Sequence, residues 1–301
     1  MSAPPLLFDR PLHRRRLDRA AARFTEAGFL KARAAEDVVE RLETIRRSFP
    51  VAVDLAARDG TFARELSASP ARERIGLLVE ADLSAAMLAG RTGPRVALDE
   101  ERLPFAPASL DLVVSTLALH WTNDLPGALV QIRRALKPDG LFIGAFFGGS
   151  TLTELRQCLM QAEEELTGGA GPRVSPFADG SDAASLLQRA GFALPVADTD
   201  RVTVRYSHPL KLLADLRAMG ETNVLAGSRR PLGRRVLGRA LELYAERFGE
   251  ADGSVRASFE IITATGWAPH EGQQQPLKPG SAKVRLADAL KVTERKLSSP
   301  E

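Results

Sequence analysis

Apolar residues recur along the first half of the chain with two alternating periods, one typical of helices and the other of strands. The apolar positions between residues 34 and 49 follow helical spacing and predict an amphipathic helix. Residues 51–55 are short, β-branched and preceded by Pro50, which predicts a buried strand. The alternation then continues, with further helices predicted over residues 61–66, 84–89 and 125–136 and further strands over residues 75–81, 95–98, 110–117 and 141–147.

Strands that alternate with helices in this way predict a parallel sheet with right-handed crossovers and with helices on both faces. The expected fold class is therefore α/β, with a Rossmann-like, doubly wound sheet and helical additions. Beyond residue 149 the pattern is more helical, with helices predicted over residues 152–166, 183–190, 210–219 and 232–248 and strands over residues 200–206 and 258–267. We expect an N-terminal helical segment over residues 1–48, a main domain over residues 49–269 with a helical insertion at about 207–250, and a loop with a flexible tail over residues 270–301.

The composition is that of an ordinary globular protein rather than a collagen-like or disordered one, with 301 residues, 44% hydrophobic and 26% charged. The single cysteine, Cys158, excludes an internal disulfide and a cysteine-based zinc cluster, and it fits a reducing compartment. No apolar run reaches the roughly 18 residues of a membrane span. The arginine-rich residues 1–24 lack the apolar core of a secretory signal.

The net charge of +3 is far from the concentrated positive charge of a nucleic-acid-binding protein. Residues 201–240, however, include nine basic residues and only two acidic ones, Asp215 and Glu221, so this segment carries a net charge of +7. It could form a surface for an anionic partner or for lipid headgroups beside the ligand site, or simply a solvated helical face. Only Tyr206 is available there to stack on a base, so no nucleic-acid partner is expected. The basic residues are Arg201, Arg205, Lys211, Arg217, Arg229, Arg230, Arg234, Arg235 and Arg239.

The turn after the first predicted strand is the first candidate ligand site, because ligands of doubly wound sheets lie at the carboxyl ends of the strands. It reads Val-Asp-Leu-Ala-Ala-Arg-Asp-Gly over residues 53–60. This turn resembles the first motif of class I S-adenosylmethionine-dependent methyltransferases, with Asp54 as the acidic residue at the strand end and Gly60 as the last glycine. Ala56 and Arg58 stand where that motif has glycine; each side chain takes space near the cofactor, and alanine resists the positive φ that glycine accepts. An ordinary βα turn is the alternative.

Acidic residues at two neighbouring strand ends extend the candidate cofactor site. Asp82 ends the second predicted strand and precedes Leu83; a carboxylate there accepts the hydroxyls of a ribose, and it could also cap the next helix. Asp99 and Glu100 follow the third strand and stand beside the apolar residues 103–105, which suits an adenine ring whose amine needs an acceptor. The intact Gly-x-Gly-x-x-Gly of a nicotinamide-dependent dehydrogenase is missing. The predicted cofactor is S-adenosylmethionine.

Longer motifs along the chain resemble the complex I assembly-factor family, whose members have the class I methyltransferase fold. The resemblance implies a role in building the quinone-reducing module of respiratory complex I, with a complex I subunit as protein partner and hydroxylation of an arginine on that subunit as the activity. The chain departs from the family at Ala56 and Ala57, where a Gly-Cys pair is usual, and at Arg58. The similarity runs from about residue 8 to residue 281, and the motifs that carry it lie at residues 7–10, 99–105, 117–126, 147–156, 175–177, 198–200, 219–223 and 252–255.

His120 and Trp121 are the candidate catalytic residues, because they follow the fourth predicted strand, which borders the transfer site in methyltransferases. His120 is a candidate general base and Trp121 a surface on which a planar guanidinium could stack; for both, a structural role is the alternative. No metal site is predicted, because the four histidines lack the spacing of a facial triad with a carboxylate. Glu221 and Asn223 lie in family-like segments, as does Glu154, for which surface charge is the favoured interpretation.

Three functions remain open from the sequence. The leading hypothesis is a methyltransferase-fold enzyme that uses S-adenosylmethionine and acts on a protein partner during complex I assembly. The second is a non-catalytic assembly chaperone whose cofactor loop has degraded at Ala56 and Arg58. The third is a small-molecule or acyl-carrier methyltransferase. Because the family-like region begins at about residue 8, we expect no transit peptide and a cytoplasmic location.

Overall fold

The computed structural model describes residues 6–227 and 231–273. Residues Met1–Pro269 form one compact unit and residues His270–Glu301 form a second. Only residues 270–273 of the second unit are described, so the predicted tail from residue 274 onward lies outside the described residues, as do Arg229 and Arg230 of the basic segment. The boundary expected at residue 48 stays a prediction.

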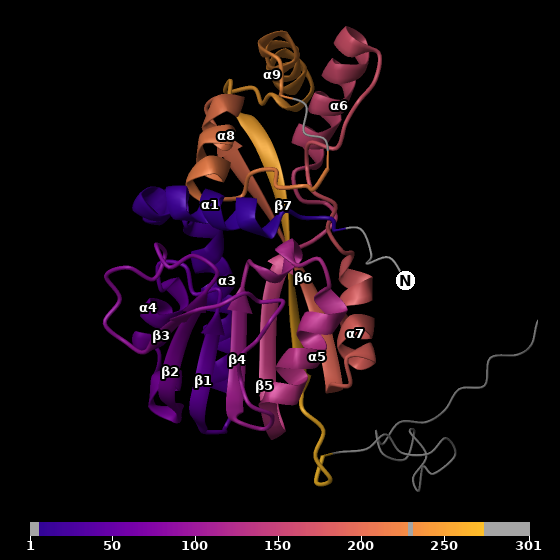
Figure 1. Ribbon diagram of the computed structural model, residues 1–301. Helices are drawn as coiled ribbons and strands as arrows, with labels where there is room; N and C mark the ends of the chain where they lie inside the picture. The colour runs from indigo at the N-terminus through magenta and orange to yellow at the C-terminus, as the bar shows by residue number, and fades with distance from the viewer. Residues whose placement is uncertain (1–5, 228–230, 274–301) are drawn as a thin grey trace, which may run out of the picture. The chain divides into compact units, whose positions relative to one another are not determined.

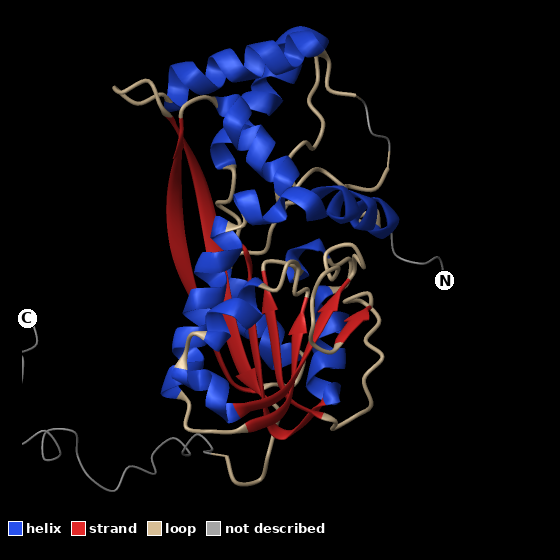
Figure 2. Ribbon diagram, turned by 90° about the vertical axis from the view of Figure 1, so that its left-hand side faces the viewer, coloured by secondary structure: helices blue, strands red, loops and turns tan. Residues whose placement is uncertain are grey.

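Seven strands form one sheet in the described part of the chain (Figures 1 and 2), in the order β3-β2-β1-β4-β5-β7-β6. The strands β1 to β5 run parallel to one another, which confirms the Rossmann-like α/β class. The sheet is not parallel throughout, because β7 runs antiparallel to both β5 and β6. The strands are β1 (Phe49–Leu55), β2 (Ile75–Asp82), β3 (Arg95–Ala97), β4 (Leu110–Thr116), β5 (Leu136–Phe147), β6 (Ala193–Tyr206) and β7 (Val255–Trp267).

Most predicted helices are present with small shifts at their ends. The described helices are α1 (Arg10–Ala20), α2 (Phe24–Ala27), α3 (Phe29–Thr44), α4 (Thr61–Ser67), α5 (Leu125–Ala135), α6 (Thr153–Thr167), α7 (Gly180–Arg189), α8 (Pro209–Ala218) and α9 (Arg234–Phe248). The helix predicted over residues 34–49 was wrong at both ends. The prediction corresponds to α3, which begins at Phe29 and ends at Thr44. The helix ends there because the backbone becomes extended at Ile45 and Phe49 already pairs with Ile75 of β2.

The predicted helix over residues 84–89 is absent and a series of turns takes its place. Ser84 Oγ accepts the Met87 N–H at 3.2 Å, as an N-cap does, but no helix follows. Gly90, whose φ is +75°, then reverses the chain toward β3. Ser84 thus makes the contact of an N-cap, although the predicted helix does not form.

Helices cover both faces of the sheet (Figure 1). Val38 of α3 and Phe62 of α4 pack in one cluster with Leu112 of β4. The next residue, Val113, packs in another cluster with Ile132 of α5. Since successive residues of a strand point to opposite faces, these two clusters lie on opposite sides of the sheet. The buried parallel strands thus explain the short apolar runs from which the fold was predicted.

The strands β6 and β7 extend beyond the rest of the sheet, and α6, α8 and α9 gather around the extension (Figure 2). The segment predicted as an insertion at about 207–250 contains α8 and α9. These helices lie beyond the end of β6, so the chain returns to the sheet as β7, which runs antiparallel to β6. α1 lies between this helical layer and the carboxyl ends of the parallel strands, and Phe8 bridges to Leu225 of the layer (Figure 1). Within the described ranges, no helix combines the length and apolar character needed to cross a membrane.

Candidate functional site

The loop after β1 has an unusual backbone conformation. Ala56 and Arg58 have φ values of 68° and 53°, and Gly60 has a φ of 74°. Alanine resists this left-handed region, yet Ala56 adopts it, because the backbone N–H groups of Ala56 and Ala57 donate to the carbonyl of Ala81 in β2 at 2.7 and 2.9 Å. Each non-glycine residue held there costs about 1–2 kcal/mol. The surrounding contacts therefore impose the shape of the loop.

The side chain of Arg58 is turned inward and pairs with Asp82. Arg58 is 1% exposed, and its Nη1 lies 2.8 Å from Asp82 Oδ2, which also accepts the Arg58 backbone N–H at 2.9 Å. The other oxygen, Asp82 Oδ1, accepts the Ser84 N–H at 2.8 Å. Both oxygens of the carboxylate predicted to bind a ribose are thus engaged within the chain. The neighbouring Leu83 packs with Leu17 and other residues of the N-terminal helices.

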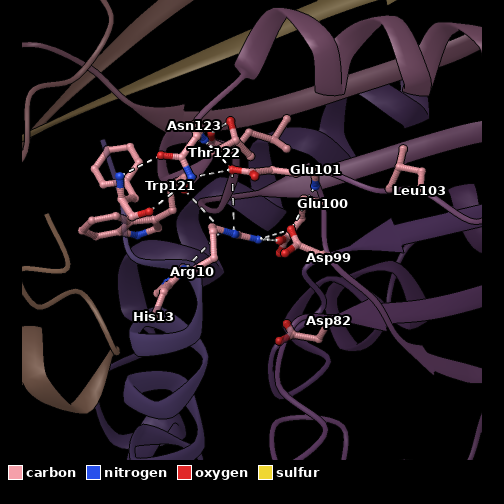
Figure 3. Close-up of polar contacts among 12 residues, drawn as sticks. Arg10, His13, Asp82, Asp99, Glu100, Glu101, Leu103, Trp121, Thr122 and Asn123 are labelled. Atoms are coloured by element: carbon pink, nitrogen blue, oxygen red, sulfur yellow. Dashed lines mark hydrogen bonds and ion pairs between the residues drawn. The ribbon is translucent and has the colours of Figure 1, made fainter. Parts of the chain in front are cut away.

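The acidic residues after β3 are also paired with an arginine (Figure 3). Arg10 of α1 donates to Asp99 Oδ1 at 2.7 Å, forms an ion pair with Glu100 and contacts the Trp121 carbonyl at 3.3 Å. Burial raises the pKa of Glu100, and the Arg10 charge counteracts that rise. The two residues predicted to receive adenine therefore anchor the N-terminal helix, and Arg10 is a residue whose role the sequence did not reveal.

Asp54 and Lys31 are two buried titratable groups beneath the loop. Asp54 is 0% exposed and neither carboxylate oxygen has a hydrogen-bond partner; burial raises its pKa to about 7. Lys31 Nζ donates to the Ala56 carbonyl at 2.9 Å and to the carbonyl and hydroxyl of Thr116 at 2.8 and 2.6 Å. Burial lowers the pKa of Lys31 to about 8, and the charge of Asp54 partly counteracts this. Its position on the apolar stripe of α3 was the sequence signal that could have identified Lys31.

A small cavity adjoins this loop. Its volume is about 20 Å³, and its walls include Lys31, Arg58 and Glu221. That is room for about one water, whereas sites for small organic ligands usually hold about 300 Å³ or more. With Asp82 engaged by Arg58 and the space this small, the loop does not fit S-adenosylmethionine in the conformation observed. The predicted cofactor residues do converge on the carboxyl ends of β1, β2 and β3.

A second cavity, of about 380 Å³, lies between this site and the helical layer. Its walls are mostly apolar, from β5, α6 and α8, and Glu221 and Phe147 line both cavities. Residues of the wall include Trp121, Phe147, Leu155, Leu159, Arg173, Phe177, Leu213, Leu216, Arg217, Glu221 and Asn223. Two spaces of different size, each with a mostly apolar lining and a few charged residues, therefore share a wall at Phe147 and Glu221.

Glu221 is fixed on that wall by the two candidate catalytic residues. Its Oε2 accepts the Trp121 Nε1–H at 2.8 Å and lies 3.2 Å from His120 Nε2. The side chains of His120 and Glu221 are 2% and 10% exposed. Trp121 lines the larger cavity, whereas His120 lines neither cavity and packs behind Glu221 against the rings of Phe147 and Phe177. His120 therefore contacts the cavity wall through Glu221 rather than lining it.

Other polar candidates have structural roles. Glu154 is buried, and its carboxylate accepts the hydroxyl and the N–H of Ser258 at 2.6 and 3.2 Å, so the interpretation as surface charge was wrong. In the basic segment, Arg239 pairs with Glu165 at 2.7 Å, which reduces the positive surface expected there. Among the residues that the structure describes, no three His, Cys, Asp or Glu side chains come together as a metal site would require.

Comparisons with known proteins agree with the architecture. Residues 53–144 match a family model described as a methyltransferase domain. The chain is 40% identical over 293 residues to a protein of Danio rerio named arginine-hydroxylase NDUFAF5, mitochondrial, covering 95% of this chain and 90% of that protein. The human protein of the same name is 41% identical, with 95% and 84% covered. The malonyl-[acyl-carrier protein] O-methyltransferase of Methylovorus sp. is 33% identical over 304 residues and 96% of each chain.

Two solved structures give the same fold at low sequence identity. The protein BH2331 of Bacillus halodurans, described as a putative methyltransferase, aligns with a TM-score of 0.53 and 15% identity over 78% of this chain and 99% of its own. The YcgJ protein of Bacillus subtilis aligns with a TM-score of 0.53 and 14% identity over 78% and 98%. These similarities confirm the class I methyltransferase fold that the strand-end motifs predicted.

Proposed function

We propose a function from the premise that the chain belongs to the family of the arginine-hydroxylase NDUFAF5. It is an enzyme of the methyltransferase fold. Its target, in our proposal, is an arginine side chain on a complex I subunit, which it modifies while the complex is being assembled. The name of the relatives supports arginine as the target. The wall shared by the two cavities is the place where we propose that its side chain binds.

The observation that carries this proposal is the position of Glu221. A carboxylate is a strong partner for a guanidinium, because the hydrogen bonds between them are charge-assisted. Glu221 Oε2 is fixed by Trp121 and its Oε1 accepts no hydrogen bond within the described ranges. The aromatic faces of Trp121 and Phe147 on the same wall suit the flat guanidinium. The apolar remainder of the larger cavity suits the aliphatic stem of an arginine.

The reaction that we propose is hydroxylation of this side chain, as in the name of the relatives. One C–H bond of the arginine becomes C–OH; with dioxygen as oxidant, the second oxygen atom leaves as water and takes up two electrons and two protons. Dioxygen and a two-electron donor are thus the co-reactants required. Glu221 binds and orients the guanidinium, and His120 positions Glu221 from behind.

A strain that lacks this chain tests the assembly role. Wild-type protein should restore assembled, active complex I, measured by in-gel activity, and Glu221→Gln should restore much less, because the amide cannot pair with a guanidinium as a carboxylate does. Glu164→Gln, an exposed carboxylate of α6, is the matched control and should behave as wild type. Full restoration by Glu221→Gln would instead support a non-catalytic chaperone.

Methylation of an acyl carrier is the second candidate, supported by the relative that is 33% identical over 96% of each chain. The apolar walls of the larger cavity also suit an acyl chain, and Arg217 could meet a terminal carboxylate there. Mass measurement of acyl carriers from the deletion strain separates the two candidates: our proposal expects no change in acyl methyl esters. Binding of S-adenosylmethionine, a cytoplasmic location and contact of residues 201–240 with an anionic partner stay proposals.

A further inference from the structure

Arg58 occupies the place where a bound nucleoside would need an acceptor. In doubly wound folds, the acidic residue at the end of the second strand receives the ribose hydroxyls. Here that residue is Asp82, and its Oδ2 accepts both the guanidinium and the backbone N–H of Arg58 while Oδ1 accepts the Ser84 N–H. Asp82 Oδ2 therefore has no acceptor site left, and Oδ1 keeps one. The chain therefore supplies from within the cation that neutralises its own ribose acceptor.

Two features of Arg58 destabilise the arrangement in which it contacts Asp82. The side chain is 1% exposed, yet its Nη2 has no hydrogen-bond partner. A buried polar group without a partner destabilises the arrangement that contains it. The residue also has a left-handed φ of 53°, which an arginine adopts only under constraint. An arrangement with these two defects can be displaced by a ligand that satisfies Asp82 better.

The space around the loop points the same way. The cavity lined by Arg58, Lys31 and Glu221 holds about 20 Å³, so a nucleoside bound to Asp82 would need the space that the Arg58 side chain now fills. Asp54 stands nearby with two buried, unpartnered oxygens, which is an acceptor ready for a cationic group of an incoming ligand. Of the predicted nucleoside acceptors, Asp99 and Glu100 are held by Arg10, whereas Asp82 is held by Arg58.

We propose that Arg58 is an internal competitor of the nucleoside cofactor, which binds to Asp82 only after the arginine side chain has left it. Arg58 thereby sets the affinity of the site for S-adenosyl ligands. The apparent dissociation constant equals the intrinsic one divided by the fraction of molecules in which Asp82 is free. Removal of the guanidinium raises that fraction. This inference rests on the proposed cofactor and not on the identity of the target side chain.

Isothermal titration calorimetry of the full-length protein with S-adenosylhomocysteine tests this inference. Arg58→Gly removes the guanidinium and accepts the positive φ without strain, so we expect it to bind at least about tenfold more tightly than wild type. Arg64→Ala, which removes a charge from α4 that pairs with Asp59 instead, is the matched control and should bind as wild type. In an Asp82→Ala background, Arg58→Gly should give no gain, because the acceptor is gone.

The outcomes separate this inference from the proposed cofactor. Equal or weaker binding by a folded Arg58→Gly variant would overturn the inference alone and would indicate that the arginine supports the loop. If neither protein releases heat at millimolar ligand, the inference and the cofactor proposal both fail. Arg58→Lys serves if the glycine variant does not fold: it keeps the charge but loses the fixed fork of donors, and it should bind several-fold more tightly than wild type. Unchanged binding by a folded Arg58→Lys would contradict the inference equally.

Discussion

An Asp54→Asn variant removes a buried charge at the end of β1 and keeps the shape of the side chain. Asp54 is fully buried without a hydrogen-bond partner, and burial raises its pKa from 3.8 to about 7. Between these two values the folded protein keeps a proton that the unfolded chain has released. Stability that is complete below the lower value is therefore lost as the pH rises toward the higher one. The Asp54→Asn variant has no titrating carboxyl at this position, so it should not lose this stability as the pH rises.

The raised pKa gives the size of the effect. A rise from 3.8 to about 7 corresponds to about 4 kcal/mol, at about 1.4 kcal/mol per pH unit. The charge of Lys31 lowers the pKa of Asp54, and its effect is already contained in the value of about 7. We expect the free energy of unfolding of the variant, relative to wild type, to rise by about 2–4 kcal/mol between about pH 4 and about pH 8.

Urea unfolding followed by circular dichroism at several pH values measures this difference. Asp59→Asn is a control of opposite sign: burial raises the pKa of Asp59, but hydrogen bonds from Thr61 and Arg64 outweigh it and lower the pKa. That carboxylate stabilises the fold above its unfolded pKa, so Asp59→Asn should become less stable than wild type as the pH rises. A difference for Asp54→Asn that does not change with pH would refute the assignment of a protonated, buried carboxyl to Asp54.

The remaining predictions concern the neighbours of this group. Lys31→Met should lower the free energy of unfolding by about 1–3 kcal/mol, measured in urea, because buried carbonyls of the loop lose their donor; a more stable variant would contradict this. Arg10→Met leaves the buried Glu100 without its partner and should cost about 3–5 kcal/mol, with faster amide exchange in α1; unchanged exchange would refute the anchoring role. Glu221→Ala should shift the tryptophan emission, since Trp121 loses its acceptor, and an unshifted spectrum would contradict that contact.

Much of the fold followed from local patterns. The strands β1 and β4 are short apolar runs because most of their residues are buried on both faces, and such runs are visible in a sequence. The end of α3 was misplaced because Ile45 and Phe49 continue the helical spacing while the strand pairing of Phe49 with Ile75 prevails. The antiparallel β7 depends on where α8 and α9 lie, which no local pattern encodes.

Some features of the candidate site could likewise be predicted from the sequence, and others could not. The positions at the strand ends, such as Asp82 and Arg58, were identifiable because the fold class fixes where loops meet. That Arg58 turns inward onto Asp82 depends on the side-chain rotamer and on the N-terminal helices above the loop. Lys31 and Arg10 act across large sequence separations, on Thr116 and Asp99 respectively. Partners of this kind become visible only when the chain is folded.

Peptide mass spectrometry of complex I subunits tests the central claim most directly. Subunits are compared from a strain that lacks this chain, from the same strain with wild-type protein, and from the strain with Glu221→Gln. The account predicts one arginine that carries an added oxygen atom with wild-type protein, loses it in the deletion strain and regains little of it with Glu221→Gln. The same oxygen on that arginine in the strain without the chain, or a methyl group in its place, would contradict the account.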